Sequence, residues 1–181
     1  MTLSDNMENL DFEDLLKINC FSNDADKQKK ASELLEIKYG CEINCMEIDE
    51  SVKFAHHARG STIIAAKLSR NVVIFQNVTI GSNLKYNKIT GEWENVGNPI
   101  LCENVIVADG AKILGPVTIG GNSVVAAGAI ITKDVPKNSI AYGVNKFKPQ
   151  NPDYDLIYNE DMISQEEIEE INKKRINELF K

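Results

Sequence analysis

Hydrophobic positions recur every six residues through the middle of the chain. They are Leu68, Ile74, Ile80, Leu101, Val107, Ile113, Ile119, Val125 and Ile131. The residue three places after each one is a turn former: Asn71, Asn77, Asn83, Asn104, Gly110, Pro116, Asn122, Gly128 and Asp134. Asn, Asp and Gly tolerate left-handed backbone and Pro presets φ, so each unit predicts a short strand followed by a corner. Three units make one coil, and stacked coils predict a three-sided parallel β-solenoid with an aliphatic core.

The six-residue register is interrupted between Ile80 and Leu101. Residues 82–99 combine Asn, Gly and Pro with Tyr86 and the only tryptophan, Trp93. Loops of this length are uncommon in compact domains unless they are functional or disordered. We therefore expect an excursion that projects from the solenoid over a binding site.

The repeat divides the chain into three segments. These are an N-terminal helical extension at 1–42, the repeat domain at 43–148, and a linker with a C-terminal helix at 149–181. In the first segment a helical pattern ends at Gly40, which is a typical C-cap. In the last segment Ser164 and Glu167 form a capping box ahead of an amphipathic pattern. The predicted fold class is mainly β with short helical ends.

Charge changes this interpretation only locally. The 181 residues carry 20 Lys and Arg against 27 Asp and Glu, and this acidic balance disfavours general nucleic-acid binding. No apolar run approaches the roughly 20 residues that span a bilayer, and the first residues lack a signal-peptide pattern. The four cysteines are too few for a disulfide framework. We expect a cytoplasmic protein without membrane insertion. Residues 51–148, however, hold 11 basic and 5 acidic residues, so the predicted solenoid is basic.

The repeats resemble a known family. The stretches VTIGSN and NPILCENVIVADGAKILGPVTIGGNSVVAAGAIITKDVPKNSIAYGV are similar to the hexapeptide-repeat acyltransferases, which have a left-handed β-helix. Within them, the GAKILG and TKDVP elements resemble the serine acetyltransferase branch and the related polysaccharide O-acetyltransferases. The resemblance covers about residues 43–148. It implies acetyl transfer from acetyl-CoA without a metal, in homotrimers whose active sites lie between adjacent solenoids.

The resemblance also implies a histidine that acts as general base on the acceptor. The only histidines are His56 and His57. The repeat phase places the family histidine two residues after an inward position, here Phe54, and selects His56. The local pattern H-A-x-G selects His57 instead. Histidine suits this task because much of it is neutral at physiological pH, and the resulting alkoxide would attack the thioester.

The acceptor is less clearly indicated, because two family positions differ. Serine acetyltransferases carry Asp before the catalytic histidine, where this chain has Ala55. They carry a second histidine in H-P-K-I, which aligns with Asn98 and the three residues after it. These departures favour a sugar or polysaccharide-precursor hydroxyl, with Trp93 and Asn98 as substrate-binding residues. Serine O-acetylation and amino-sugar N-acetylation are the alternatives.

The family pattern also gives expectations for the cofactor. Ala108 and Ala126 match positions that approach the pantetheine arm of CoA in relatives, and Lys133, in TKDVP, matches a basic position near its phosphates.

Two other classes of function share this architecture. Zinc carbonic anhydrases of the β-helix type use three histidines, and Cys41, Cys45 and the histidine pair have weak spacing for zinc. A non-catalytic solenoid could serve as an assembly scaffold. A histidine at the family's catalytic phase argues against that interpretation.

Overall fold

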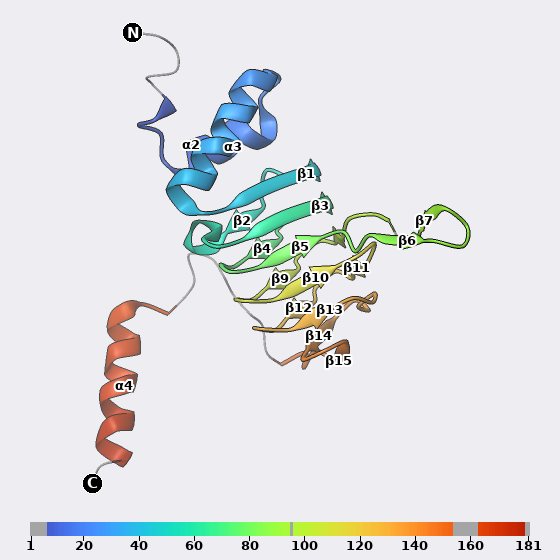
Figure 1. Ribbon diagram of the computed structural model, residues 1–181. Coiled ribbons are helices and arrows are strands. Elements are labelled where there is room, and N and C mark those ends of the chain that lie inside the picture. The colour runs from blue at the N-terminus through green and yellow to red at the C-terminus, as the bar shows by residue number, and fades with distance from the viewer. Residues whose placement is uncertain (1–6, 95, 154–162, 180–181) are drawn as a thin grey trace. The chain divides into compact units, whose positions relative to one another are not determined.

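The centre of the protein is a stack of short parallel strands wound into a three-sided solenoid (Figure 1). The computed structural model describes residues 7–94, 96–153 and 163–179. Two compact units are distinguished, residues 1–150 and residues 151–181. The first holds the solenoid with two helices, and the second holds one helix.

The elements follow the predicted order. The helices are α2 (Phe12–Phe21), α3 (Ala25–Tyr39) and α4 (Gln165–Leu179), with a short 3-10 turn, η1 (Ala55–Ala58). The strands of the first coils are β1 (Glu42–Ile48), β2 (Lys53–Phe54), β3 (Thr62–Leu68), β4 (Val73–Ile74) and β5 (Thr79–Gly81). After the interruption, which contains β6 (Lys85–Asn87) and β7 (Glu92–Glu94), come β8 (Ile100–Leu101), β9 (Ile106–Val107), β10 (Lys112–Leu114), β11 (Thr118–Ile119), β12 (Val124–Val125), β13 (Ile130–Ile131), β14 (Ser139–Tyr142) and β15 (Lys146–Pro149).

Each coil contributes one strand segment to each of three faces. The β9 face contains β2, β4, β9, β12 and β14, which pair in parallel. The β10 face contains the first halves of β1 and β3 with β5, β10 and β13. The β11 face contains the second halves of β1 and β3 with β8 and β11. The strand β15 closes the β9 face as an antiparallel edge.

The core consists of three columns of inward side chains, one for each face. They are Ile43, Ile63, Ile80, Ile113 and Ile131 on the β10 face, Ile48, Leu68, Leu101, Ile119 and Val135 on the β11 face, and Phe54, Ile74, Val107, Val125 and Ala141 on the β9 face. All except Ile48 are buried. The predicted fold class, a three-sided parallel β-helix with short helical extensions, is confirmed.

The three corners of the solenoid are built in different ways. We call the corner from the β9 face to the β10 face the site edge, the next one the arm edge, and the corner from the β11 face to the β9 face the ladder edge. Positive φ is found at the predicted turn formers of the site and ladder edges, namely Asn71, Asn77, Asn104, Gly110, Asn122 and Gly128. Asn83, Pro116 and Asp134 lie on the arm edge without positive φ. There Gly115 has a φ of 100°, and the Asp134 side chain accepts a hydrogen bond from the Thr118 backbone N–H at 2.8 Å.

The predicted excursion is an arm made of a β-hairpin. Strands β6 and β7 pair antiparallel, and the arm projects from the arm edge away from the coils (Figure 1). The Tyr86 and Trp93 rings lie 5.2 Å apart across the hairpin and are both exposed. Ile89 near its tip is 96% exposed. The arm therefore buries little within its own chain, and whether it covers a binding site remains a prediction.

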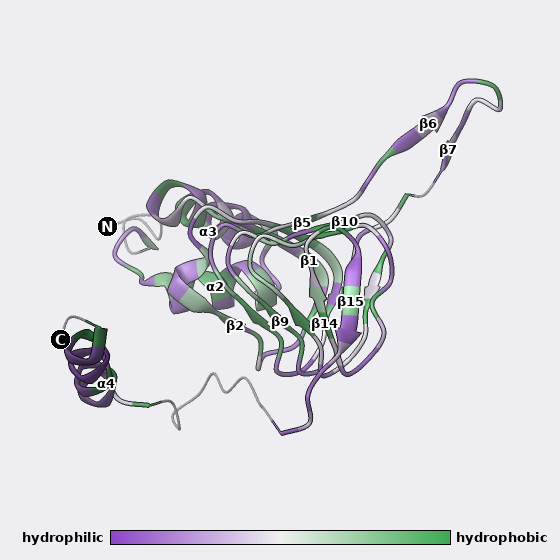
Figure 2. Cartoon of the chain, turned by 90° about the horizontal axis from the view of Figure 1, so that it is seen from below, coloured by the Kyte–Doolittle hydropathy of each residue, from purple (hydrophilic) through white to green (hydrophobic). Residues whose placement is uncertain are grey.

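The N-terminal helices cover the end of the core beside β1. Asp11 and Asp24 cap them with side-chain hydrogen bonds, and Gly40 ends α3 in the left-handed region, as predicted. Phe12, Leu15 and Leu35 are buried in the same cluster as the solenoid core. The helical pair thus packs against the first coil, and both helices carry apolar as well as polar stretches (Figure 2).

The second unit contains α4. Its capping box is present, since the Glu167 backbone N–H donates to Ser164 Oγ at 3.2 Å and the Ser164 backbone N–H donates to Glu167 Oε2 at 3.0 Å. None of the α4 side chains is buried. Over the described residues, no helix combines the length and apolar character needed to cross a membrane.

Candidate functional site

The first corner of the site edge contains three more residues than the corners of the following coils. Phe54 pairs in register with Ile74, so the coils match up to that point. The Asn77 backbone N–H then donates to the Arg59 carbonyl, just as Gly110 donates to Gln76 and Gly128 to Asp109. Arg59 therefore occupies the place of Gln76 in the next coil. Residues 56–58 are an insertion, which we call the inserted turn.

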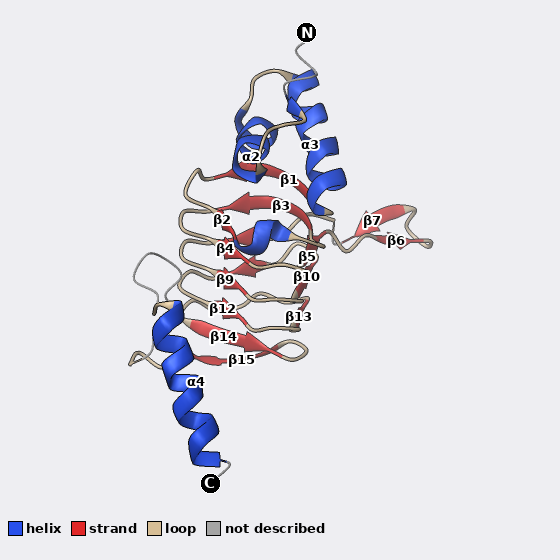
Figure 3. Cartoon of the chain, turned by 90° about the vertical axis from the view of Figure 1, so that its left-hand side faces the viewer, coloured by secondary structure: helices blue, strands red, loops and turns tan. Residues whose placement is uncertain are grey.

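The inserted turn has an unusual backbone. His56, His57 and Ala58 all have positive φ, at 52°, 59° and 49°. They belong to the 3-10 turn η1, which is the short blue helix drawn in front of the strands in Figure 3. Left-handed backbone costs a non-glycine residue about 1–2 kcal/mol, so three in succession are expensive. Such geometry persists only where the surroundings hold it, and it concentrates at functional sites. Ala58 is fully buried, whereas both histidines are exposed.

His57 is held by the N-terminal helices. Its ring centroid lies 5.2 Å from that of Phe12 in α2 and 5.3 Å from that of Tyr39 in α3. The Arg59 guanidinium lies 5.6 Å from the Tyr39 ring centroid. The Gly60 backbone N–H also donates to the Gly40 carbonyl at 3.1 Å. The helical pair therefore contacts the inserted turn through His57 and holds the chain just after it through Arg59 and Gly60.

His56 faces the next coil instead. Its ring centroid lies 6.1 Å from that of Phe75, and within the described chain neither of its ring nitrogens has a hydrogen-bond partner. An exposed imidazole with uncommitted nitrogens can exchange a proton with a bound molecule. The structure thus gives the two histidines different surroundings.

Below the inserted turn, the site edge presents a row of aligned residues. Phe75, Ala108, Ala126 and Tyr142 follow the paired core positions of β4, β9, β12 and β14. Backbone N–H groups of Phe75, Ala108 and Ala126 donate to the next coil at 2.8–2.9 Å. Ala108 and Ala126 are half-buried. Two small side chains between two aromatic ones leave room beside the backbone for an extended ligand.

The other predicted site residues lie on the arm edge. Trp93 is on the arm, Asn98 is half-buried at its base, and Lys133 is exposed at a later corner of the same edge. The β10 face separates them from His56, Ala108 and Ala126. One chain therefore does not bring all the predicted residues into a single site.

The groups considered for zinc do not converge. Across the ranges that the structure describes, no three His, Cys, Asp or Glu side chains are arranged to hold a metal ion. Burial raises the pKa of Cys41 to about 11 and that of Cys45 to about 12, which disfavours the thiolate form that binds zinc.

Comparisons with known proteins identify relatives of the solenoid. No protein-family model matches the chain. A putative serine acetyltransferase of Schizosaccharomyces pombe is 36% identical over 108 residues, which is 59% of this chain and 37% of that protein. Serine acetyltransferase of Bacillus pumilus is 33% identical over 92 residues, 50% of this chain and 39% of that protein.

The fold comparison agrees. The crystal structure of serine acetyltransferase from Neisseria gonorrhoeae matches with a TM-score of 0.55 and 24% identity, over 74% of this chain and 50% of that one. This chain spans about two fifths of the length of the curated relatives it matches. The solenoid is therefore similar in sequence and in fold to serine acetyltransferases, which confirms its resemblance to that branch of the hexapeptide-repeat acyltransferases.

Proposed function

We propose that this protein transfers an acetyl group from acetyl-CoA to the hydroxyl of serine. The similarity to serine acetyltransferases supports both the donor and the acceptor. It favours serine over the sugar hydroxyl that the departures at Ala55 and Asn98 suggested, because the relatives found are named for serine.

The observation that carries the proposal is the composition of the site edge. It combines an exposed histidine on a strained insertion with a row of small residues directly below it. We assign the general base to His56, because the His57 ring packs against the helical pair. Neutral His56 removes the proton from the acceptor hydroxyl as the oxygen attacks the thioester carbon, and CoA leaves as the thiol.

The pantetheine arm of CoA would run over Ala108 and Ala126 toward the later coils. At these positions a larger side chain would compete with the ligand for space. Lys133 lies across the β10 face from this path, so within this proposal it contributes to the phosphate end from a neighbouring copy.

We further propose that the site is completed by a second copy in a homotrimer. The site edge holds the base and the proposed cofactor path, while the arm edge holds Trp93, Asn98 and Lys133. Packing the site edge of one copy against the arm edge of the next would unite both sets. The exposed aromatic pair of the arm supports this arrangement, because exposed apolar surface of this kind marks contact sites.

An acceptor screen tests the proposed reaction. The protein is incubated with acetyl-CoA and, in separate reactions, serine, simple sugars, amino sugars and nucleotide sugars, and free thiol is measured. We expect thiol release above the acceptor-free rate with serine and the specificity constant to be highest for it. A sugar or amino sugar preferred over serine would overturn the acceptor assignment, and no detectable binding of CoA at millimolar concentration would overturn the enzyme assignment.

A further inference from the structure

One buried polar atom on the site edge lacks a partner. Among all the residues that the structure describes, the side-chain oxygen Oε1 of Gln76 is the single buried side-chain nitrogen or oxygen without a hydrogen bond. Leaving such a group unpaired costs about 1–3 kcal/mol. Buried polar side-chain atoms in folded proteins are paired in the large majority of cases, so this exception calls for an explanation.

Gln76 lies directly beneath the inserted turn. It occupies the same place in its coil as Arg59 in the coil above, and Arg59 directly follows the three inserted residues. The backbone on both sides of the carboxamide is fixed. The Asn77 N–H donates to the Arg59 carbonyl at 2.8 Å, and the Gln76 carbonyl accepts from Gly110 at 3.2 Å. The backbone hydrogen bonds of this corner are therefore formed without the Gln76 side chain.

His56 is a candidate donor by its placement. Its ring lies over the second coil, 6.1 Å from the ring of Phe75, the residue that precedes Gln76. Its two nitrogens have no hydrogen-bond partner within the described chain. A neutral imidazole carries one N–H donor and one acceptor, and the hydrogen bond made by the first fixes which nitrogen remains a base.

We propose that Gln76 is a positioning residue for His56, whose ring N–H donates to Gln76 Oε1. This contact leaves the other ring nitrogen unprotonated and directed away from the coil, toward a bound acceptor. It forms by rotation of the imidazole and gives the orphaned oxygen its partner. Its catalytic consequence rests on the proposed acetyl transfer, but the contact itself does not.

The donors of the neighbouring side chains have other contacts. Asn77 Nδ2 donates to Asp109 Oδ1 at 3.0 Å, Lys112 Nζ donates to the Asn77 carbonyl at 3.0 Å and to Thr79 Oγ1 at 2.9 Å, and the Arg59 guanidinium lies 5.6 Å from the Tyr39 ring centroid. Besides His56, the titratable or charged groups around the inserted turn are His57, Arg59, Tyr39, Asp109 and Lys112. All of them are unchanged in the variants used below, so any difference is due to position 76.

Proton NMR titration of the free protein tests the contact without a substrate. The protein has only two histidines, and the ring signal that disappears in His56→Ala belongs to His56. In Gln76→Glu, a carboxylate replaces the acceptor oxygen beside the ring. We expect the titration midpoint of His56 to rise by about one pH unit, as a nearby opposite charge stabilises imidazolium.

Gln28→Glu is the matched control, since it makes the same chemical change on α3. Gln28 is 11 residues from Tyr39, or about 16 Å along the helix axis. We expect no shift of the His56 signal in this variant. Equal shifts in the two Glu variants, or none in either, would overturn the proposed contact.

A kinetic comparison separates positioning from folding. In Gln76→Met, which keeps the side-chain length without the acceptor, we expect kcat to fall about tenfold while KM for acetyl-CoA stays within twofold. Unchanged kcat would overturn the positioning role. Absence of acetyl transfer in the unmodified protein would instead refute the proposed function, and the NMR result would still decide the contact.

Discussion

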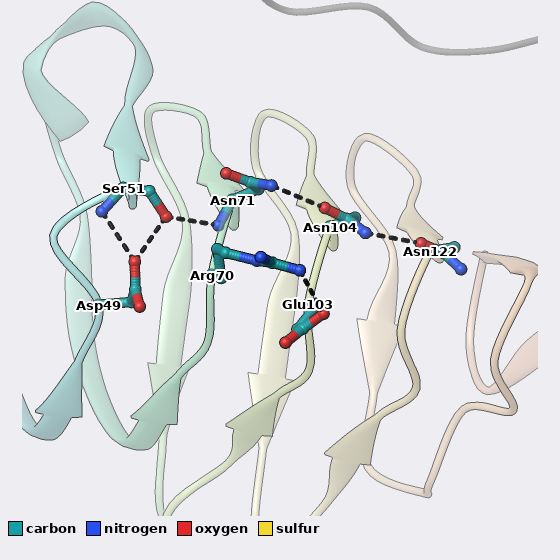
Figure 4. Close-up of polar contacts among 7 residues, drawn as sticks. All are labelled: Asp49, Ser51, Arg70, Asn71, Glu103, Asn104 and Asn122. Carbon is teal, nitrogen blue, oxygen red and sulfur yellow. Dashed lines mark hydrogen bonds and ion pairs between the residues drawn. The ribbon is translucent and has the colours of Figure 1, made fainter.

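The ladder edge and the site edge are corners of the same solenoid, but their residues are arranged in different ways. On the ladder edge the Asn71 amide donates to Asn104 at 3.1 Å, and Asn104 donates to Asn122 at 2.8 Å (Figure 4). Asn122 in turn donates to Asn138 at 3.1 Å. From Asn71 to Asn138, each corner there has an asparagine at the same place as the corner above it. On the site edge the first corner breaks the repeat with an insertion, and the next contains an unpaired oxygen.

This contrast shows how the solenoid combines stability with chemistry. Identical corners allow identical side chains to bond from coil to coil, so the ladder edge resists opening. A corner that departs from the repeat cannot take part in such a ladder, but it can direct side chains outward. The cost of the inserted turn is offset by the helical pair that holds His57.

The largest expected effect is on the site edge. His56→Ala should lower acetyl transfer by about a hundredfold or more, because it removes the proposed general base. The thermal midpoint should change little, since the ring is exposed and the proposed contact with Gln76 is a single hydrogen bond. Steady-state rates and a melting curve on the same sample check both parts. A larger loss in His57→Ala, with His56→Ala still active, would reverse the assignment of the base.

Next in size is a break of the backbone beside the ladder. A Cβ on Gly120 would lie 2.8 Å from both Lys137 Cα and the Pro136 carbonyl carbon in the coil below. Gly120→Ala should therefore destabilise the fold by about 1–3 kcal/mol, because the two coils must move apart. Urea unfolding measures the loss. Gly128→Ala is not a neutral control because its φ is positive, so Gly81→Ala, where nothing lies within 4 Å, is the comparison.

Removing one rung of the ladder should have a smaller effect. In Asn104→Ala, the hydrogen bonds to Asn71 and Asn122 are lost and a residue with φ of 59° loses its favoured side chain. We expect a loss of about 1–2 kcal/mol in the free energy of unfolding, with unchanged kcat. Reduced kcat at unchanged stability would mean that the two edges are not separate in function.

A further variant removes part of the contact between the helices and the inserted turn. Tyr39→Leu removes the ring that packs on His57 and under Arg59. We expect kcat to fall about threefold to tenfold, because the inserted turn loses its support, while the stability loss stays near 1 kcal/mol. Tyr39→Phe keeps the ring and should restore both. Failure of Tyr39→Phe to restore them would mean that ring packing is not the cause.

The smallest effect is expected from the ion pair on the ladder edge. Arg70 and Glu103 approach to 3.2 Å, but both side chains are more than half exposed. Glu103→Gln should change the free energy of unfolding by less than about 0.5 kcal/mol. The difference should be smaller still at high salt. A larger loss that persists in salt would show that this pair, rather than the asparagines, supports the edge.

Much of the fold could be predicted from the sequence, because the six-residue period repeats the same physical choice in every coil. The aliphatic columns and the left-handed asparagines follow from that choice. The arm could not be identified as a hairpin, because its strands have only three residues each and little alternation. The corners at Asn83, Pro116 and Asp134 also lacked a common conformation that residue type could reveal.

The candidate site was harder to predict. Spacing could have revealed the insertion, since Phe54 and Ile63 are nine residues apart where Ile74 and Ile80 are six apart. His56 and His57 differ in their surroundings because the His57 ring packs against Phe12 and Tyr39, which belong to the preceding helices. The sequence pattern does not single out Gln76, because its proposed role depends on the inserted turn that lies above it in space.

Subunit complementation tests the central claim most directly. One variant carries His56→Ala, and the other replaces residues 84–96 of the arm with a short Gly–Ser linker. Each alone should be nearly inactive. After co-expression, random mixing in the proposed trimer should restore about one quarter of the unmodified activity, since a site then needs one intact edge from each of two neighbours. An arm-deleted protein with full activity, or mixed trimers with none, would contradict a site shared between the two edges.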